Sequence, residues 1–334
     1  MRIRYLPTAG LLAALFAGGL SAAQEPPAGP AGWIKRAAEI TNIQADGMPA
    51  FQLSARLRVW APKNQSLDGS YDLIWISPSQ WREEISLPGY TRIRVGGPGK
   101  YWQKRTLPYE WVQVSDLDSL LDVERLVRLI GDSKLKMAQN ISREGKDLSC
   151  VEMRFGRTGI RHVCFDKGSG ALDLEEGSSS HTTENVMDRR AYSEFRQWGN
   201  KIFPWAITGL SAEKAIIQFS VASLTAPQSA DPALFQPPPG ADEWASCAAI
   251  ATPKLVNVVP VNASGTAAVT GQRRTVWVYA VIQTNGTLSH VSLETPIDTN
   301  LDRAILEAVS RWRFRPIICG GVPVRKETLV GYSY

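Results

Sequence analysis

The sequence contains little histidine and cysteine, and neither occurs at a spacing typical of a metal or catalytic site. Its 334 residues include three histidines, His162, His181 and His290, and four cysteines. No HxxxH, HExxH, CxxC or GxSxG pattern is present. Zinc sites need clustered ligands, and α/β-hydrolases place their nucleophile in a GxSxG turn. We therefore expect no metal, no cofactor and no catalytic residue, and we predict that the protein is not an enzyme.

A large charge excess is also lacking. The chain has 37 basic and 32 acidic residues, a formal net charge of +5. Arg2 and Arg4 lie in a segment that we expect to be removed, and without them 35 basic and 32 acidic residues remain, a net charge of about +3. Nucleic-acid-binding domains are far more basic than this. Paired carboxylates for acid/base work are missing too, because the neighbours in Glu83-Glu84 and Glu175-Glu176 face opposite sides of a strand. We expect no nucleic-acid partner.

No apolar run reaches the roughly 20 residues that a membrane-spanning helix needs. The short run from Leu11 to Leu20 follows two arginines and precedes Ser21-Ala22-Ala23, which is typical of a signal peptide cleaved before Gln24. We predict that residues 1–23 are removed and that the protein is periplasmic. The alternative is an uncleaved N-terminus that anchors it to the inner membrane. Residues 24–32, rich in proline, alanine and glycine, predict a flexible leader.

The four cysteines fit an oxidising compartment. Cys150 and Cys164 flank two apolar runs with Gly156-Arg157-Thr158-Gly159 midway between them, which predicts a hairpin that brings the two sulfurs together. We predict disulfides between Cys150 and Cys164 and between Cys247 and Cys319.

Residues 33–235 are predicted to form a β-rich domain. Phe51, Leu53, Ala55, Leu57 and Val59 alternate with polar residues, so one face of this strand should be buried. Similar patterns predict strands over 69–76, 81–87, 91–95, 100–106, 146–165, 171–174, 192–198 and 216–223. Helices are predicted over 33–40 and 116–130, the second capped by Ser115 or Asp116. The proline-rich segment 236–250 is predicted to be a linker.

Two features of the β-rich domain have competing interpretations. Gly96-Gly97-Pro98-Gly99-Lys100 superficially matches a phosphate loop, but strand-like residues follow it, which favours a hairpin turn. The nearby Arg92, Arg94, Lys100, Lys104 and Arg105 are interpreted as a solvated strand face. Nine of the 11 tryptophans lie between Trp33 and Trp244; they either fill a core or line a cavity for an acyl chain.

Residues 251–334 predict a small α/β domain with the order β-hairpin, helix, strand. Three features support this prediction. Apolar residues alternate from Val276 to Ile282, Asn285-Gly286 is typical of a tight turn, and apolar residues at helical spacing end at Trp312. The Trp312-x-Phe314-x-Pro316 sequence after the helix resembles the TonB C-terminal domain family. The resemblance implies that Trp312, Phe314 and Pro316 belong to the core, and that the domain docks on an envelope or outer-membrane protein by strand addition.

The β-rich domain resembles the LolA/LolB-type lipoprotein-carrier fold. The resemblance is carried by the meander from Phe51 to Trp102, by Tyr192-x-x-Phe195 with Pro204 downstream, and by Phe235-x-Pro237-Pro238. It implies an antiparallel half-barrel covered by helices, with a cavity for a lipid or acyl ligand. The expected fold is α+β with a second ββαβ domain. The expected function is transport of a hydrophobic ligand, such as a lipid or lipoprotein; the alternative is a structural or regulatory envelope adaptor without a small ligand.

Overall fold

The structure is a computed structural model that describes residues 27–61, 65–156, 159–178, 187–227, 231–247, 253–261, 275–294, 296 and 299–333. The predicted signal peptide and His181 lie outside these ranges. None of the helices within them is long and apolar enough to cross a membrane.

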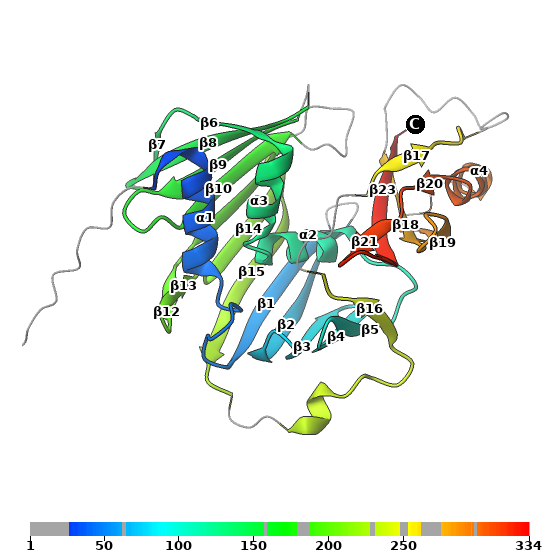
Figure 1. Ribbon diagram of the computed structural model, residues 1–334, viewed down its shortest axis with the longest axis horizontal. Helices are drawn as coiled ribbons and strands as arrows, with labels where there is room; N and C mark the ends of the chain where they lie inside the picture. Colours follow the sequence, from blue (N-terminus) through cyan, green and yellow to red (C-terminus); the bar gives the residue numbers. More distant parts are fainter. Residues whose placement is uncertain are drawn as a thin grey trace, which may run out of the picture.

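One large antiparallel sheet dominates the molecule (Figure 1). Its strand order is β16-β5-β4-β3-β2-β1-β15-β14-β11-β10-β9-β8-β6, with β7 paired to β8. Among the described strands this sheet does not close, because β16 and β6 stand at its two ends. Its strands are β1 (Phe51–Ala61), β2 (Gln65–Ser77), β3 (Gln80–Leu87), β4 (Tyr90–Gly97), β5 (Lys100–Arg105), β6 (Lys134–Met137), β7 (Ile141–Arg143), β8 (Lys146–Phe155), β9 (Gly159–Asp166), β10 (Leu172–Ser178), β11 (Met187–Ser193), β14 (Ala206–Ser211), β15 (Lys214–Thr225) and β16 (Asp242–Ala245).

Three helices cover one face of this sheet: α1 (Gly29–Thr41), α2 (Val112–Leu121) and α3 (Arg125–Leu129) (Figure 1). The alternation in β1 is confirmed, since Phe51, Leu53, Ala55, Leu57 and Val59 are all buried. They form one core with Ile34 of α1 and Leu117 of α2, among other residues. The antiparallel sheet with few helices fits the α+β class. The glycine-rich segment is a hairpin turn between β4 and β5, as predicted.

Four local predictions were wrong. The expected helix 116–130 is two helices and a 3₁₀ turn (Ile130–Asp132), and Ser115 and Asp116 lie inside α2 rather than at its cap. The expected strand 192–198 is divided between β11 and a small hairpin of β12 (Arg196–Trp198) and β13 (Lys201–Phe203). Helix α1 begins within the predicted leader. The predicted linker contributes β16, which pairs with β5.

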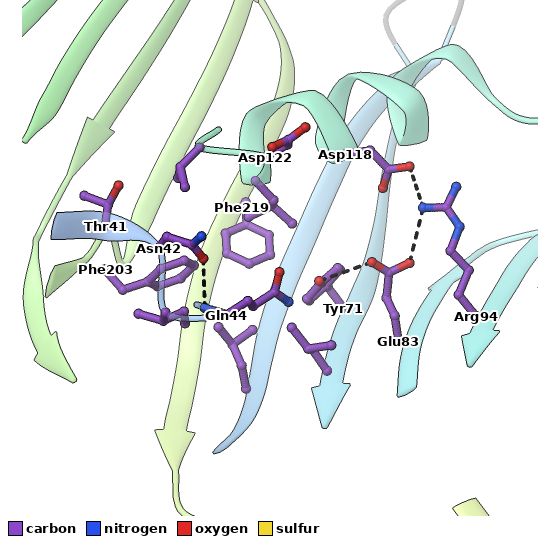
Figure 2. A pocket seen from close by; sticks show the side chains of 15 residues that line it. Thr41, Asn42, Gln44, Tyr71, Glu83, Arg94, Asp118, Asp122, Phe203 and Phe219 are labelled. Carbon is purple, nitrogen blue, oxygen red and sulfur yellow. Dashed lines mark hydrogen bonds and ion pairs between the residues drawn. The ribbon is translucent and has the colours of Figure 1, made fainter. Parts of the chain in front are cut away.

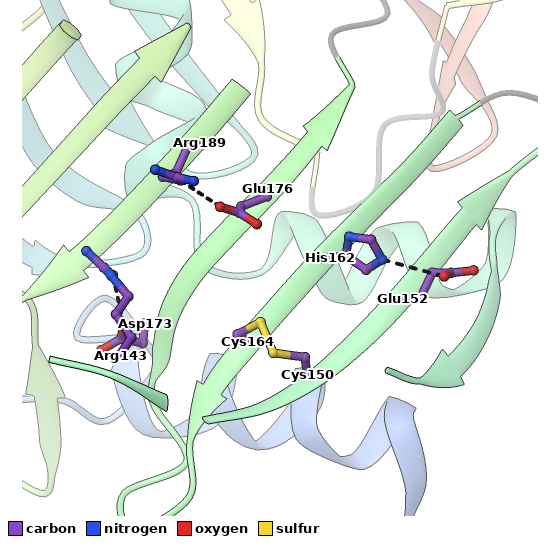
Figure 3. The surroundings of a disulfide bond; sticks show 8 residues. All are labelled: Arg143, Cys150, Glu152, His162, Cys164, Asp173, Glu176 and Arg189. Atoms are coloured by element: carbon purple, nitrogen blue, oxygen red, sulfur yellow. Dashed lines mark hydrogen bonds and ion pairs between the residues drawn. A yellow bond between two sulfur atoms is a disulfide. The ribbon is translucent and has the colours of Figure 1, made fainter. Parts of the chain in front are cut away.

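Both predicted disulfides are present. Cys150 and Cys164 are paired residues of β8 and β9, and their sulfurs are bonded (Figure 3). Cys247, just after β16, is bonded to Cys319 of β21 (Ile317–Cys319). The second disulfide therefore ties the edge of the large sheet to the C-terminal part.

The C-terminal part has the predicted order of elements. Strands β18 (Thr275–Ile282) and β19 (Leu288–Leu293) precede α4 (Thr299–Ser310), and β23 (Lys326–Ser333) completes a sheet of order β19-β18-β23. Short strands β17 (Leu255–Asn257) and β20 (Arg313–Phe314) pair, as do β21 and β22 (Val322–Val324). Trp312 and Phe314 are buried as expected, and the Trp312 indole Nε1 donates to the Val259 carbonyl at 2.9 Å. Pro316 is exposed, so its predicted place in the core was wrong.

Candidate functional site

A groove of about 300 Å³ opens between the large sheet and the segment that joins α1 to β1. Figure 2 shows Phe203 and Phe219 beneath the helices, with Asn42 and Gln44 beside them. Apolar side chains from β1, β2, β15 and α2 complete the floor: Leu53, Leu73, Phe219 and Leu121. A second hollow of about 530 Å³, lined by Trp75 and Trp81 among others, shares Leu73 and Leu121 with the groove. Apolar side chains thus line part of a recess that has room for a section of a lipid chain, and polar side chains line the rest.

One wall of the groove is polar. Glu83 of β3 accepts a hydrogen bond from the Tyr71 hydroxyl at 3.3 Å, and Asp118 of α2 accepts one from Arg94 at 2.8 Å (Figure 2). Burial alone would raise the pKa of Asp118, but the guanidinium groups of Arg92 and Arg94 bring it below its usual value. The wall therefore keeps its charges, and its polar groups are already bonded to one another.

Arg92 lies behind this wall and is completely buried, with 0% of its side chain exposed. It contacts Glu83 at 2.7 Å, Asp118 at 2.6 Å and also Glu110. The predicted solvated face of basic residues was wrong for Arg92, Arg94 and Arg105, whose side chains are 0%, 17% and 9% exposed. Buried charges are tolerated because each is paired and hydrogen-bonded.

The ion-pair network continues into the C-terminal part. Arg105 of β5 contacts Glu110 at 2.8 Å and Glu327 of β23 at 2.6 Å. Tyr279 of β18 accepts from Arg105 at 2.8 Å and donates to Glu327 at 2.6 Å. Trp244, Tyr279 and Val281 form a buried cluster with Tyr101 of the large sheet. We call this junction between the large sheet and the β18–β23 pair the seam.

A carboxylate from the C-terminal part binds the first turn of α2. Glu294 accepts from the backbone N–H of Val112 at 3.0 Å, while its other oxygen is buried and has no partner among the described residues. The pKa of Glu294 is raised to about 7, mainly by burial; the nearby Asp116 and Glu110 contribute to the rise, and the hydrogen bond from Val112 opposes it. Burial likewise raises the pKa of Asp116 to about 6.

The other residues singled out in the sequence lie apart from the groove. His162 lies on β9 beside Glu152, 3.5 Å away (Figure 3), and His290 is exposed on β19. Glu175 and Glu176 do face opposite ways: Glu175 is buried among Arg125, Arg161 and Arg190, whereas Glu176 binds Arg189 at 2.6 Å. The structure does bring Tyr192, Phe195 and Pro204 together, in a narrow apolar gap under α1.

Comparisons with known proteins show that this chain is similar to several solved structures. No family model and no curated protein matches the sequence. A LolA superfamily protein from Nitrosomonas europaea is 15% identical, with 63% of this chain and 98% of that chain covered and a TM-score of 0.42. A DUF1329 family protein from Desulfovibrio piger is 10% identical, with 63% and 98% covered and a TM-score of 0.43.

The chain is also similar, over 91% of its length, to a chain in the MucA/MucB complex of Pseudomonas aeruginosa. That similarity covers 93% of the other chain at 10% identity, with a TM-score of 0.27. At these TM-scores none of the three similarities carries an argument about the function of this protein.

Proposed function

We propose that the protein is a periplasmic, non-enzymatic binding protein whose large part carries a hydrophobic ligand, a lipid or the acyl chain of a lipoprotein. The proposal includes the finer statement that residues 33–235 form a LolA/LolB-like carrier domain. The groove supports it most directly, because Leu53, Leu73 and Phe219 line a recess inside the fold. Filling that recess with an alkyl chain would remove apolar surface from water, at about 25 cal/mol per Å².

The rim of the groove and the adjoining hollow is polar. Asp46, Asp122 and Glu124 line this rim, and Asn42 donates to Glu124 at 2.8 Å. An amphiphile suits such a site, since its apolar chain would lie on Leu73 and Leu121 while its polar end stays at the rim.

For residues 251–334 we propose a TonB-like docking domain that binds an envelope or outer-membrane protein. In the described part of the chain, β19 and β23 are the outer strands of the three-stranded sheet. An outer strand has unpaired backbone groups that a partner strand can bind. Capture from envelope extract by the full-length protein, at several salt concentrations, tests this part; failure to retain any specific partner would contradict it.

Mass spectrometry of the protein purified from its native envelope tests the carrier. We expect a co-purifying lipid or acylated peptide under native conditions, released by organic solvent. A protein that never carries such a ligand, in native spectra or solvent extracts, would contradict the carrier and favour the envelope adaptor instead.

A further inference from the structure

The net positive charge of the protein is concentrated in its C-terminal part. Residues 251–334 contain nine basic and five acidic residues, whereas residues 24–250 contain 26 basic and 27 acidic residues. Among the described residues from 253 onward, one acidic side chain, that of Glu307, is exposed, against six exposed basic ones: Lys254, Arg303, Arg311, Arg313, Arg315 and Arg325. Such an asymmetry between two parts of a chain favours contact of the basic part with a negatively charged surface.

Four of these cations lie on one face of the short ribbon formed by β17 and β20. Arg311, Arg313 and Arg315 alternate with two buried aromatic residues, so the three arginines point away from the core. Lys254 lies opposite Arg315, whose backbone N–H donates to the Lys254 carbonyl at 2.9 Å. Residues directly opposite in an antiparallel pair share a face. Strand β20 and helix α4 lie on the side of the C-terminal part that points away from the large sheet (Figure 1).

The protein does not neutralise these four cations. None of them has a carboxylate within 4.0 Å among the described residues. Arg313 donates a hydrogen bond of 2.9 Å, but its acceptor is the backbone carbonyl of Trp312. Arginines of the large sheet differ, since Arg92 and Arg105 each contact at least two carboxylates. The charges on the ribbon are therefore available to a partner outside the chain.

Exposed apolar side chains lie beside these cations. Val256 of β17 and Val258 just after it are 63% and 53% exposed. The pairing register shifts at Val256, which lies between the residues paired with Phe314 and Arg313. Apolar side chains within a cationic surface can enter the headgroup region of a bilayer, while the cations attract anionic lipids. We call this surface the basic face; it comprises Lys254, Val256, Val258, Arg311, Arg313 and Arg315.

We propose that the basic face binds the surface of an anionic lipid bilayer. Its four cations contact lipid phosphates, and the two valines enter the headgroup region. The cations are spread over both strands of the ribbon, and a fluid layer of anionic headgroups can meet each of them, whereas a protein needs a matched carboxylate for each. The ribbon is separate from the β19-β18-β23 sheet, whose edges are proposed for a protein partner, and this binding does not use the groove.

Flotation of the full-length protein with lipid vesicles tests the proposal. We expect binding to vesicles of phosphatidylcholine with phosphatidylglycerol, and little binding to phosphatidylcholine alone. An ionic strength of about 1 M, where the Debye length falls to about 3 Å, should release the protein. The triple variant Arg311→Gln, Arg313→Gln, Arg315→Gln should bind anionic vesicles at least about tenfold more weakly, since each cation near an anionic bilayer contributes about fivefold.

The double variant Val256→Ser, Val258→Ser tests the apolar contribution and should weaken binding about threefold to tenfold. Its matched control is Met137→Ser, Ile141→Ser, which removes two exposed apolar side chains from the edge of the large sheet. The control for the arginines is a triple variant that removes the same charge from exposed positions outside the C-terminal part: Arg56→Gln, Lys167→Gln and Lys214→Gln. Both controls should bind as the wild type does.

The Leu121→Trp variant separates this proposal from the carrier function. It fills the groove and should still bind anionic vesicles with wild-type affinity, so failure of the carrier and failure of the basic face give different results. All variants should keep the wild-type circular dichroism spectrum. Absence of binding to anionic vesicles, equal binding to neutral ones, or equal loss in the two triple variants would overturn the proposal. Capture of an acidic protein through the basic face, without vesicle binding, would overturn it in favour of a protein partner.

Discussion

The groove and a cavity of about 450 Å³ in the seam are neighbours with different linings. The groove has apolar residues in its floor and an acidic rim, whereas aromatic residues such as Trp81 and Tyr101 line the seam cavity. Arg94 and Asp118 line both spaces, so a single ion-paired wall separates them. The comparison teaches that one buried network can form the wall of two spaces, because its charges are neutralised by partners within the wall.

The largest effect should come from breaking the shared wall at Arg92. Arg92→Met leaves Glu83, Glu110 and Asp118 without their common cation, and removal of one partner from a buried ion network typically costs about 3–5 kcal/mol. Urea unfolding followed by circular dichroism measures this loss. Arg58→Met, which breaks the exposed pair with Asp68, is the matched control and should leave the midpoint nearly unchanged. Equal midpoints for the two variants would contradict the structural role of the wall.

The next largest effect should distinguish the two spaces. The double variant Cys247→Ser, Cys319→Ser removes a link across 72 residues, which should cost about 2–4 kcal/mol. Because the bond lies at the seam, binding of an acyl probe in the groove should persist in this variant. Urea unfolding measures the loss of stability, and calorimetry with the acyl probe measures the binding. Loss of acyl binding in a folded variant would show that the two spaces are not independent.

A smaller effect concerns the pH dependence of the contact between Glu294 and the first turn of α2. The pKa of Glu294 is raised from its usual 4.5 to about 7, so the folded state holds this proton more tightly than the unfolded state. Stability from this group is complete below pH 4.5 and is lost as the pH rises to 7. Because the Glu294 side chain is partly exposed, we expect the free energy of unfolding to change by about 1–2 kcal/mol over this pH range.

Glu294→Gln should remove this part of the pH dependence and stabilise the protein at pH 7. Glu307→Gln, at an exposed position of α4, is the control and should leave the curve unchanged. Denaturant midpoints measured between pH 4.5 and pH 7.5 provide the test. A Glu294→Gln protein with the wild-type slope would contradict the assigned environment of this carboxylate.

The sequence predicted the elements whose signals are local. Period-two alternation placed β1 correctly, because burial on one face of a strand is visible in the strand itself. The Cys150–Cys164 pairing followed from the hairpin turn between the two cysteines. The family resemblance predicted that Trp312, Phe314 and Pro316 belong to the core. Trp312 and Phe314 are buried, whereas Pro316 is exposed.

The candidate sites depend on contacts between distant segments, and the sequence does not show these. Arg92 was interpreted as solvated, yet it and Val95, which face opposite sides of β4, are both completely buried. Helix α2 begins earlier than predicted, and Glu294, 182 residues further along the chain, binds the N–H of Val112 in its first turn. The strand β16 has only four residues, too few for a periodic signal, and is stabilised by pairing with β5.

Titration of the Leu121→Trp variant with cis-parinaric acid, a fluorescent acyl probe, tests the carrier function most directly. Leu121 lines both the groove and the adjoining hollow, so an indole at this position should fill the space that an acyl chain needs. Val322→Trp, at a position 62% exposed on β22, is the control. We predict saturable binding by the wild type and by Val322→Trp, and a loss of about tenfold or more in Leu121→Trp. Equal binding by all three proteins, or none by the folded wild type, would contradict a hydrophobic-ligand carrier.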